Sequence, residues 1–277
     1  MKYGSIPFVS QPVSRIVLGA SGQRFAEGAD VSDLMEAALS CGINAVDTAR
    51  QYGQSEQAIG RWLSAGGNRE RIVIISKCCH PAMAFVDRVN EQAAEEDLNR
   101  SLEALQTPYI DVYLLHRDNE SVPVGRIVDF LNRFHEEGRI GAFGGSNWRA
   151  ERIAQANAYA AAHGLKGFSV SSPHFSLGHQ RHDPWGNGCR TITGRKTRRS
   201  APIIRKRARR CWPGPACAAA YFQAKSRRRN GPSWPSAWAG GKNGPTAAGT
   251  TGSAWPDAKR WPRKKTQPRR RSRWRGC

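Results

Sequence analysis

Hydrophobic and polar positions follow two different periods over the first 193 residues of the chain. Short apolar runs, typical of strands buried in a parallel sheet, are separated by longer segments with apolar residues three and four apart, typical of helices. The predicted strands are Arg15–Gly19, Asn44–Ala49, Ile72–Cys78, Asp111–His116, Ile140–Asn147 and Gly167–Ser172. The predicted helices are Val31–Cys41, a helix beginning at Ser55, residues 90–106, residues 122–137 and Trp148–His163.

This alternation predicts an α/β fold. Strands joined by helices form right-handed crossovers and so build a parallel sheet. A TIM (β/α)8-type barrel is the favoured closure, and the pattern supplies about six of its βα units. The chain has 277 residues, which is enough for one such barrel. Asp30 and Ser55 stand where two of the helices start, and we expect them to act as caps.

The pattern ends near Gly194. Among Leu, Ile, Val, Met and Phe, residues 194–277 contain only Ile203, Ile204 and Phe222, beside nine Pro and six Trp. A segment of this composition cannot bury enough apolar surface to offset its conformational entropy. The sequence therefore predicts two parts. Residues 1–193 form an incomplete barrel, and residues 194–277 form a disordered Arg/Pro/Trp-rich tail.

The distribution of charged residues changes at the same position in the chain. The whole chain has a net charge of +21, which by itself suggests a partner such as nucleic acid or an acidic membrane surface. Residues 1–193 carry 19 basic and 21 acidic side chains, whereas residues 194–277 carry 24 basic side chains and the single acid Asp257. A uniformly basic protein is thereby excluded.

We interpret the tail as the product of a reading-frame shift near residue 194, because out-of-frame translation of GC-rich DNA yields Arg, Pro, Gly, Ala and Trp in excess.

The alternative is an evolved basic appendage. Lys and Arg interleaved with tryptophan could bind single-stranded nucleic acid by charge and stacking, and the chain would then be a nucleic-acid-binding protein. Such a protein should also carry basic residues on its folded part, and residues 1–193 have a net charge of −2. We therefore expect the tail to bind polyanions without sequence preference.

Other features of the sequence point to a cytoplasmic protein. No apolar run approaches the roughly 18–20 residues that cross a bilayer, and residues 1–10 do not resemble a signal peptide. The seven cysteines have no paired spacing, and Cys78 and Cys79 are adjacent. Four histidines (His80, His174, His179 and His182) have no ligand partner at metal-binding spacing, so we expect no metal site and place them on the surface or in loops.

Candidate catalytic residues lie at or just after the ends of three predicted strands. Asp47 and Tyr52 lie at the end of one strand and in the loop after it, while Lys77 and His116 end the next two strands. A TIM barrel has its active site at the C-terminal ends of its strands. Taken singly, each of these residues could be an ordinary loop or surface residue, but together on one rim they predict an active site.

These motifs resemble those of the aldo-keto reductases, which are NADPH-dependent enzymes on a TIM barrel. The resemblance covers about residues 3–193 and is carried by Gly42–Gly53, the strands ending in Lys77 and His116, and Gly138-Arg139-Ile140 leading to Gly145-Ser146-Asn147. It implies reduction of a small aldehyde or ketone to an alcohol. It also implies a catalytic tetrad of Asp47, Tyr52, Lys77 and His116.

The resemblance further implies a binding site for the nicotinamide of NADPH. Ser146 and Asn147 match the pair that hydrogen-bonds the carboxamide, and Ser172 stands where the family usually has a glutamine. A family member should continue with two more strands, which carry an aromatic residue that stacks on the nicotinamide and basic residues that bind the 2′-phosphate. No such pattern follows Gly194. We therefore predict that the chain as written is inactive.

The chemistry of the four residues agrees with these roles. Reduction of a carbonyl requires a hydride at carbon and a proton at oxygen. Tyrosine ordinarily has a pKa near 10, and a neighbouring ammonium favours its phenolate and makes it a better acid. An aspartate would keep that lysine charged, and a histidine would donate a hydrogen bond to the oxygen as negative charge develops.

Overall fold

The computed structural model describes residues 1–81, 87–176 and 191–193. Its main feature is a parallel sheet with the strand order β3-β4-β5-β6-β7-β8. These strands are β3 (Leu18–Gly19), β4 (Ala45–Asp47), β5 (Val73–Cys78), β6 (Ile110–Leu115), β7 (Ile140–Ser146) and β8 (Val170–Ser172). Each strand pairs with the next one along the chain, as in a TIM barrel. The predicted fold class is confirmed: the six strands and their helices form part of such a barrel.

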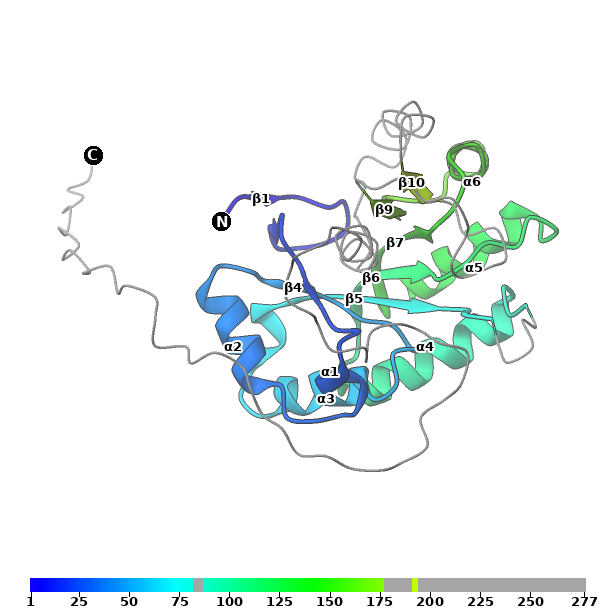
Figure 1. Ribbon diagram of the computed structural model, residues 1–277. Coiled ribbons are helices and arrows are strands. Elements are labelled where there is room, and N and C mark those ends of the chain that lie inside the picture. Colours follow the sequence, from blue (N-terminus) through cyan, green and yellow to red (C-terminus); the bar gives the residue numbers. More distant parts are fainter. Residues whose placement is uncertain (82–86, 177–190, 194–277) are drawn as a thin grey trace, which may run out of the picture. The chain divides into compact units, whose positions relative to one another are not determined.

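Helices connect these strands (Figure 1). They are α1 (Gln23–Ala26), α2 (Ser32–Ser40), α3 (Ser55–Ser64), α4 (Glu91–Leu105), α5 (Val124–Glu136) and α6 (Ala150–Ala162), with a 3-10 turn η1 (Asn68–Arg71). All five predicted helices are present. The short helix α1 and the turn η1 were not predicted, because four residues are too few to show a helical period.

The two faces of the sheet belong to two separate apolar clusters. Side chains of a strand alternate between the faces. One set, which includes Ile74 and Tyr113, packs against the helices together with Trp62 and Leu98. The other set fills the interior of the partial barrel, and its buried members are Ile6, Val13, Ala45, Val73, Ile75, Val112, Leu114, Ala142 and Val170. This alternation fixes which strand residues face the interior.

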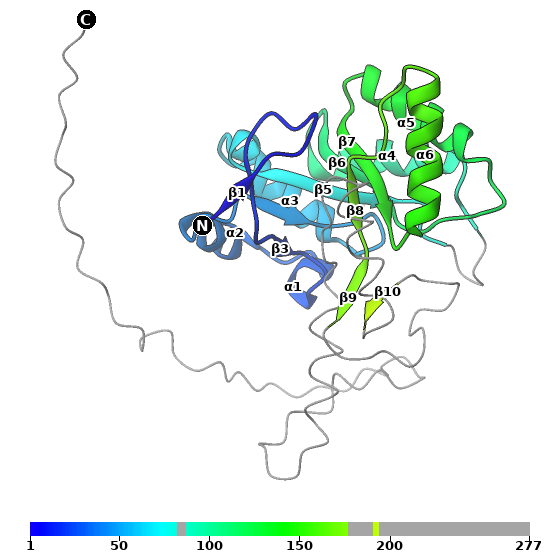
Figure 2. The same ribbon diagram turned by 90° about the horizontal axis from the view of Figure 1, so that it is seen from above.

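A short hairpin covers the N-terminal ends of the strands. Its strands β1 (Tyr3–Gly4) and β2 (Val13–Ser14) pair antiparallel, and Ile6 and Val13 join the interior cluster. The backbone N–H of Ser14 donates to Oδ1 of Asn44, just before β4, at 2.8 Å. Figure 2 shows the hairpin beside the sheet. The sequence analysis did not predict this hairpin, because two-residue strands show no clear alternation.

One of the two predicted helix caps is wrong. Helix α3 begins at Ser55, but its hydroxyl donates to the carbonyl oxygen of Ala20 at 2.8 Å, and no side chain caps the helix. Val31 rather than Asp30 directly precedes α2, yet the Asp30 carboxylate accepts from the N–H of Ser32, the first residue of that helix, at 2.9 Å. A tertiary contact therefore replaces the cap at Ser55, whereas Asp30 satisfies a free N–H at the start of α2.

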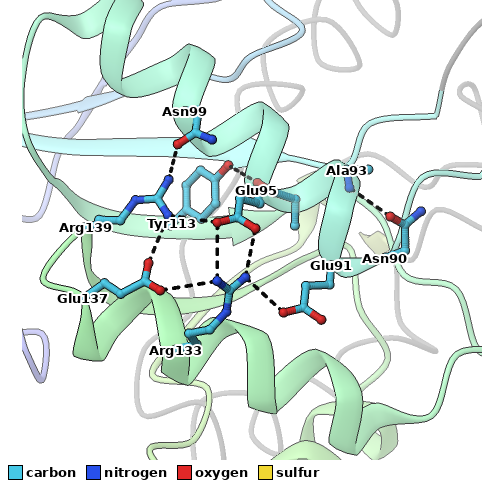
Figure 3. A network of polar contacts seen from close by, with 10 residues as sticks. Asn90, Glu91, Ala93, Glu95, Asn99, Tyr113, Arg133, Glu137 and Arg139 are labelled. Atoms are coloured by element: carbon cyan, nitrogen blue, oxygen red, sulfur yellow. Dashed lines mark hydrogen bonds and ion pairs between the residues drawn. The ribbon is translucent and has the colours of Figure 1, made fainter.

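Helices α4 and α5 are joined by a network of ion pairs on the outer surface (Figure 3). Arg133 lies 3.0 Å from both Glu91 and Glu95, and Arg139 pairs with Glu95 and Glu137. Exposed ion pairs contribute little singly, on the order of 0–1 kcal/mol, and more as a network. The network fixes the spacing of the two helices that flank β6.

Past β8 the described residues are few. Strand β9 (His174–Ser176) pairs in parallel with β10 (Thr191–Thr193). The predicted disordered tail, residues 194–277, lies outside the described residues, so the boundary at residue 193 stays a prediction.

Candidate active site

The period of two along the strands places the predicted site residues on one face. Asp47 has the same parity as Ala45, Lys77 as Ile75 and His116 as Leu114, and each of these apolar residues belongs to the interior cluster. Ser146 and Ser172 follow Ala142 and Val170 by an even number of residues. All five side chains are buried. The interior face of the partial barrel therefore changes from apolar to polar at the C-terminal ends of the strands.

Lys77 and Asp47 form a buried ion pair at this end. The Lys77 ammonium donates to Oδ1 of Asp47 and to the carbonyl oxygen of Thr48, the latter at 2.8 Å. Only 2% of the lysine side chain and 4% of the aspartate side chain are exposed. Burial works to lower the pKa of Lys77, but the charge of Asp47 and the interactions with Tyr52 outweigh it, and the pKa lies above its ordinary value. The lysine is therefore charged at neutral pH.

Tyr52 approaches the same ammonium from the loop between β4 and α3. Its hydroxyl oxygen lies 3.5 Å from Nζ of Lys77, and the half-buried ring has its centroid 5.0 Å from that atom. The next residue, Gly53, has φ +60, and a Cβ there would lie 2.5 Å from the carbonyl oxygen of Ala26. Only glycine fits this turn without strain, and the turn presents the tyrosine to the lysine.

His116 completes the group from the residue after β6. Its ring centroid lies 5.8 Å from that of Tyr52, edge to face at 79°. Burial, the Lys77 charge and the Arg117 charge hold the pKa of His116 well below its ordinary value. The imidazole is therefore neutral at pH 7 and has one N–H to donate. The structure thus brings Asp47, Tyr52, Lys77 and His116 together, as the sequence analysis expected.

The three residues expected at the nicotinamide lie at the ends of β7 and β8. The hydroxyl of Ser146 donates to the carbonyl oxygen of Ser172 at 3.1 Å, and the side-chain amide of Asn147 donates to Oγ of Ser146 at 3.2 Å. Oδ1 of Asn147 accepts from the N–H of His174 at 2.7 Å. Oγ of Ser172 is buried and has no hydrogen-bond partner among the described residues. A carboxamide, which both donates and accepts, fits that hydroxyl.

One predicted histidine placement is corrected by the structure. His174 is neither on the surface nor in a loop: it lies in β9 and only 3% of it is exposed. His80 is a loop residue after β5, as predicted; it is half-buried, and its ring lies 4.7 Å from that of His116. His179 and His182 lie outside the described residues. No group of three His, Cys, Asp or Glu that could hold a metal ion occurs in residues 1–81, 87–176 and 191–193.

The sequence analysis also missed a buried carboxylate beside the site. Oε1 of Glu56 accepts from the hydroxyl of Ser76 at 2.6 Å, and Oε2 pairs with Arg50 at 2.8 Å. These contacts fasten the loop that carries Tyr52 to β5 next to Lys77. A signal was available, because Glu56 is three residues before Ile59 on the buried face of α3.

Comparison with known proteins agrees with this geometry. The profile of the aldo/keto reductase family matches residues 15–184. The chain is 31% identical over 175 residues to the aldo-keto reductase YhdN of Bacillus subtilis, an alignment that covers 60% of this chain and 53% of the relative. It is 30% identical over 182 residues to norsolorinic acid reductase B of Dothistroma septosporum, covering 59% and 46% of the two chains.

A third relative is the protein tas of Escherichia coli, 34% identical over 136 residues, which cover 42% of this chain and 38% of tas. The chain spans about half the length of the curated relatives it matches. Among the described residues, no helix is long and apolar enough to cross a membrane.

Proposed function

This chain belongs to the aldo/keto reductase family, and we propose that its site reduces a small aldehyde or ketone to an alcohol with NADPH. Members of this family are oxidoreductases that act on carbonyl groups. The observation that carries the proposal is the position of the Lys77 ammonium, which is held by Asp47 and lies 3.5 Å from the hydroxyl of Tyr52.

Tyr52 is the proton donor in this proposal. When its proton passes to the substrate oxygen, the phenolic oxygen becomes negative 3.5 Å from a cation that the buried Asp47 keeps in place. A charge already positioned in a buried site stabilises this developing anion with little reorganisation. The hydrogen bond from Nζ to the carbonyl oxygen of Thr48, at 2.8 Å, further restricts the lysine.

His116 is the second group for the substrate oxygen. Because its imidazole is neutral, it donates a hydrogen bond without placing a second cation beside Lys77. Its ring lies edge to face with the ring of Tyr52, with the centroids 5.8 Å apart. In this proposal the carbonyl oxygen of the substrate accepts a hydrogen bond from both side chains, and such donors polarise a carbonyl.

Ser146, Asn147 and Ser172 would hold the carboxamide of the nicotinamide. The hydroxyl of Ser172 has no hydrogen-bond partner in the described part of the chain and could donate or accept, and the second amide hydrogen of Asn147 could donate to the carboxamide oxygen. When bound, the nicotinamide supplies the hydride.

The proposal specifies NADPH rather than NADH as the reductant, and it includes a cytoplasmic location for the protein. The free thiols Cys41, Cys78 and Cys79 suit a reducing compartment.

We propose also that the chain as written turns over little or no substrate. The sequence from Gly194 onward offers three large aliphatic or phenylalanine side chains, too few for the apolar strands that would complete a barrel. Incomplete closure leaves sheet edges whose backbone groups lack partners.

A chimera separates the two proposals. Residues 1–176 are joined to the corresponding C-terminal part of the Bacillus subtilis relative, and the chimera and the chain as written are compared by NADPH and NADH oxidation with a panel of aldehydes. We expect turnover with NADPH from the chimera only. A chimera that folds and binds NADPH but reduces no carbonyl would contradict the proposed chemistry. Turnover by the chain as written, abolished by Tyr52→Phe, would contradict its proposed inactivity.

A further inference from the structure

His116 contacts two aromatic rings rather than one. The ring of Tyr52 lies 5.8 Å away and the ring of His80 lies 4.7 Å away, centroid to centroid, the latter at an interplanar angle of 74°. His80 follows β5 by two residues, so the strand that supplies Lys77 also supplies this second ring. Both contacts are edge to face, the arrangement that stabilises aromatic pairs beyond their buried area.

The His116 imidazole lacks the contact that ordinarily orients a histidine in an active site. Such rings are held by a hydrogen bond from the nitrogen that does not act, to a carbonyl or a carboxylate. In His116 the Nδ1 atom is buried, and no described residue forms a hydrogen bond with it. Among the described residues, packing is therefore what orients the ring.

His80 is well placed to supply that packing because it is fixed itself. Its Nδ1 lies 3.0 Å from the carbonyl oxygen of Pro81. A carbonyl oxygen only accepts, so this nitrogen carries the hydrogen. Burial lowers the pKa of His80, and the charges of Arg117 and Arg88 act in the same direction against Asp97 and the Pro81 contact. A neutral ring adds no charge beside His116 and Lys77.

We propose that His80 is a positioning residue that packs on His116 and holds its imidazole in one orientation. The proposal deepens the proposed function and rests on it for the role of His116 toward the substrate oxygen. A ring free to turn would present its N–H to that oxygen for part of the time only. Loss of the His80 ring should therefore weaken catalysis without removing any group that touches the substrate.

The test is NMR relaxation of the histidine ring C–H groups, which reports how far each ring is held in one orientation, in the full chain and in the chimera. His80→Ala removes the packing, His80→Phe keeps a ring without its nitrogens, and His163→Ala is the matched control. His163 stacks on Tyr159 at 4.0 Å on the exposed surface, away from the strand ends. We expect a high order parameter for the ring of His116 in the wild type, a lower one in His80→Ala, and recovery in His80→Phe. The control should leave the order parameter of His116 unchanged.

An unchanged order parameter for the His116 ring in a folded His80→Ala variant would overturn the proposal. Should that variant fail to fold by circular dichroism, His80→Phe decides alone. A wild-type order parameter in it supports packing by the ring, and a lowered one contradicts it. In an active chimera, His80→Ala should lower kcat about tenfold with KM nearly unchanged. The NMR result needs no turnover, so an inactive chimera would count against the proposed function and not against the role of His80.

Discussion

Lys77 and Asp47 are held together across neighbouring strands although they are not partners in the sheet. Asp47 at the end of β4 pairs with Ile75, and Lys77 stands two residues further along β5 on the same face. The lysine side chain spans this offset and donates to the aspartate. An ammonium is thereby kept in the buried interior, where Tyr52 can reach it.

Lys77→Met should destabilise the fold strongly. It leaves the Asp47 carboxylate buried without its cation, and removing one partner of a buried ion pair costs about 3–5 kcal/mol. The double variant Asp47→Asn/Lys77→Met removes both charges and should recover part of this loss. Urea unfolding followed by circular dichroism measures both. Equal stability of wild type and Lys77→Met would show that the pair has no structural role.

Tyr52→Phe should abolish carbonyl reduction by the chimera and leave NADPH binding nearly intact. The ring packing is kept and only the hydroxyl is lost. General acid catalysis is typically worth about 10²–10⁴-fold. Steady-state rates and a fluorescence titration with NADPH give the two quantities. A variant that retains more than about a tenth of the wild-type rate would exclude Tyr52 as the proton donor.

The neutral state of His116 predicts that acid weakens the fold. Burial and the Lys77 and Arg117 charges hold its pKa well below the ordinary value. The unfolded chain takes up this proton near the ordinary pKa of about 6.5, and the native chain does not. The free energy of unfolding should therefore fall as pH drops below about 6.5, by at most about 1.4 kcal/mol per pH unit for this group.

Two variants isolate this contribution in urea unfolding at several pH values. His116→Gln should flatten the loss of stability. Asp118 acts in the opposite sense, because burial, against the Arg152 charge, raises its pKa to about 6. Its native form takes up a proton before the unfolded form does, which stabilises the fold as pH falls through that range. Asp118→Asn should therefore steepen the loss of stability with falling pH. If this pH dependence were unchanged in both variants, His116 and Asp118 would be ruled out as its source.

Gly53→Ala should cost more stability than Gly67→Ala. Both glycines have positive φ, +60 and +67, so an alanine is strained by about 1–2 kcal/mol at each. A Cβ at Gly53 would also lie 2.5 Å from the carbonyl oxygen of Ala26, whereas no described atom lies within 4 Å of a Cβ at Gly67. The difference between the unfolding free energies of the two variants measures the energetic cost of bringing a Cβ close to the carbonyl oxygen of Ala26. Equal losses would mean that the Tyr52 loop can shift away from α1.

The charge of residues 194–277 predicts binding to any polyanion. These residues, which lie outside the described part of the chain, have a net charge of +23, and a version ending at residue 193 has a net charge of −2. The logarithm of the affinity of the full chain for DNA should fall linearly with the logarithm of the salt concentration. The shorter version should not bind. Discrimination between unrelated oligonucleotides at one salt concentration would instead favour an evolved nucleic-acid-binding tail.

The sequence by itself determined the order of strands and helices and the identity of the four residues at the strand ends. Both properties are local. The apolar period of each segment specifies its type, and the end of the apolar run in β5 or β6 identifies Lys77 or His116 without knowledge of any other segment. The family motifs are also short stretches, which is why the resemblance could be seen before the fold.

Only the tertiary structure decided which of these residues touch. Whether Lys77 reaches Asp47 depends on the register of two strands, and whether His80 packs on His116 depends on how the residues after β5 and β6 come together. The hydroxyl of Ser55 bonds Ala20 instead of capping its own helix for the same reason. Such contacts join residues that are 30 or more positions apart, and no local sequence pattern predicts them. They form because burial forces each polar group to find a partner among whatever side chains the packed strands bring within reach.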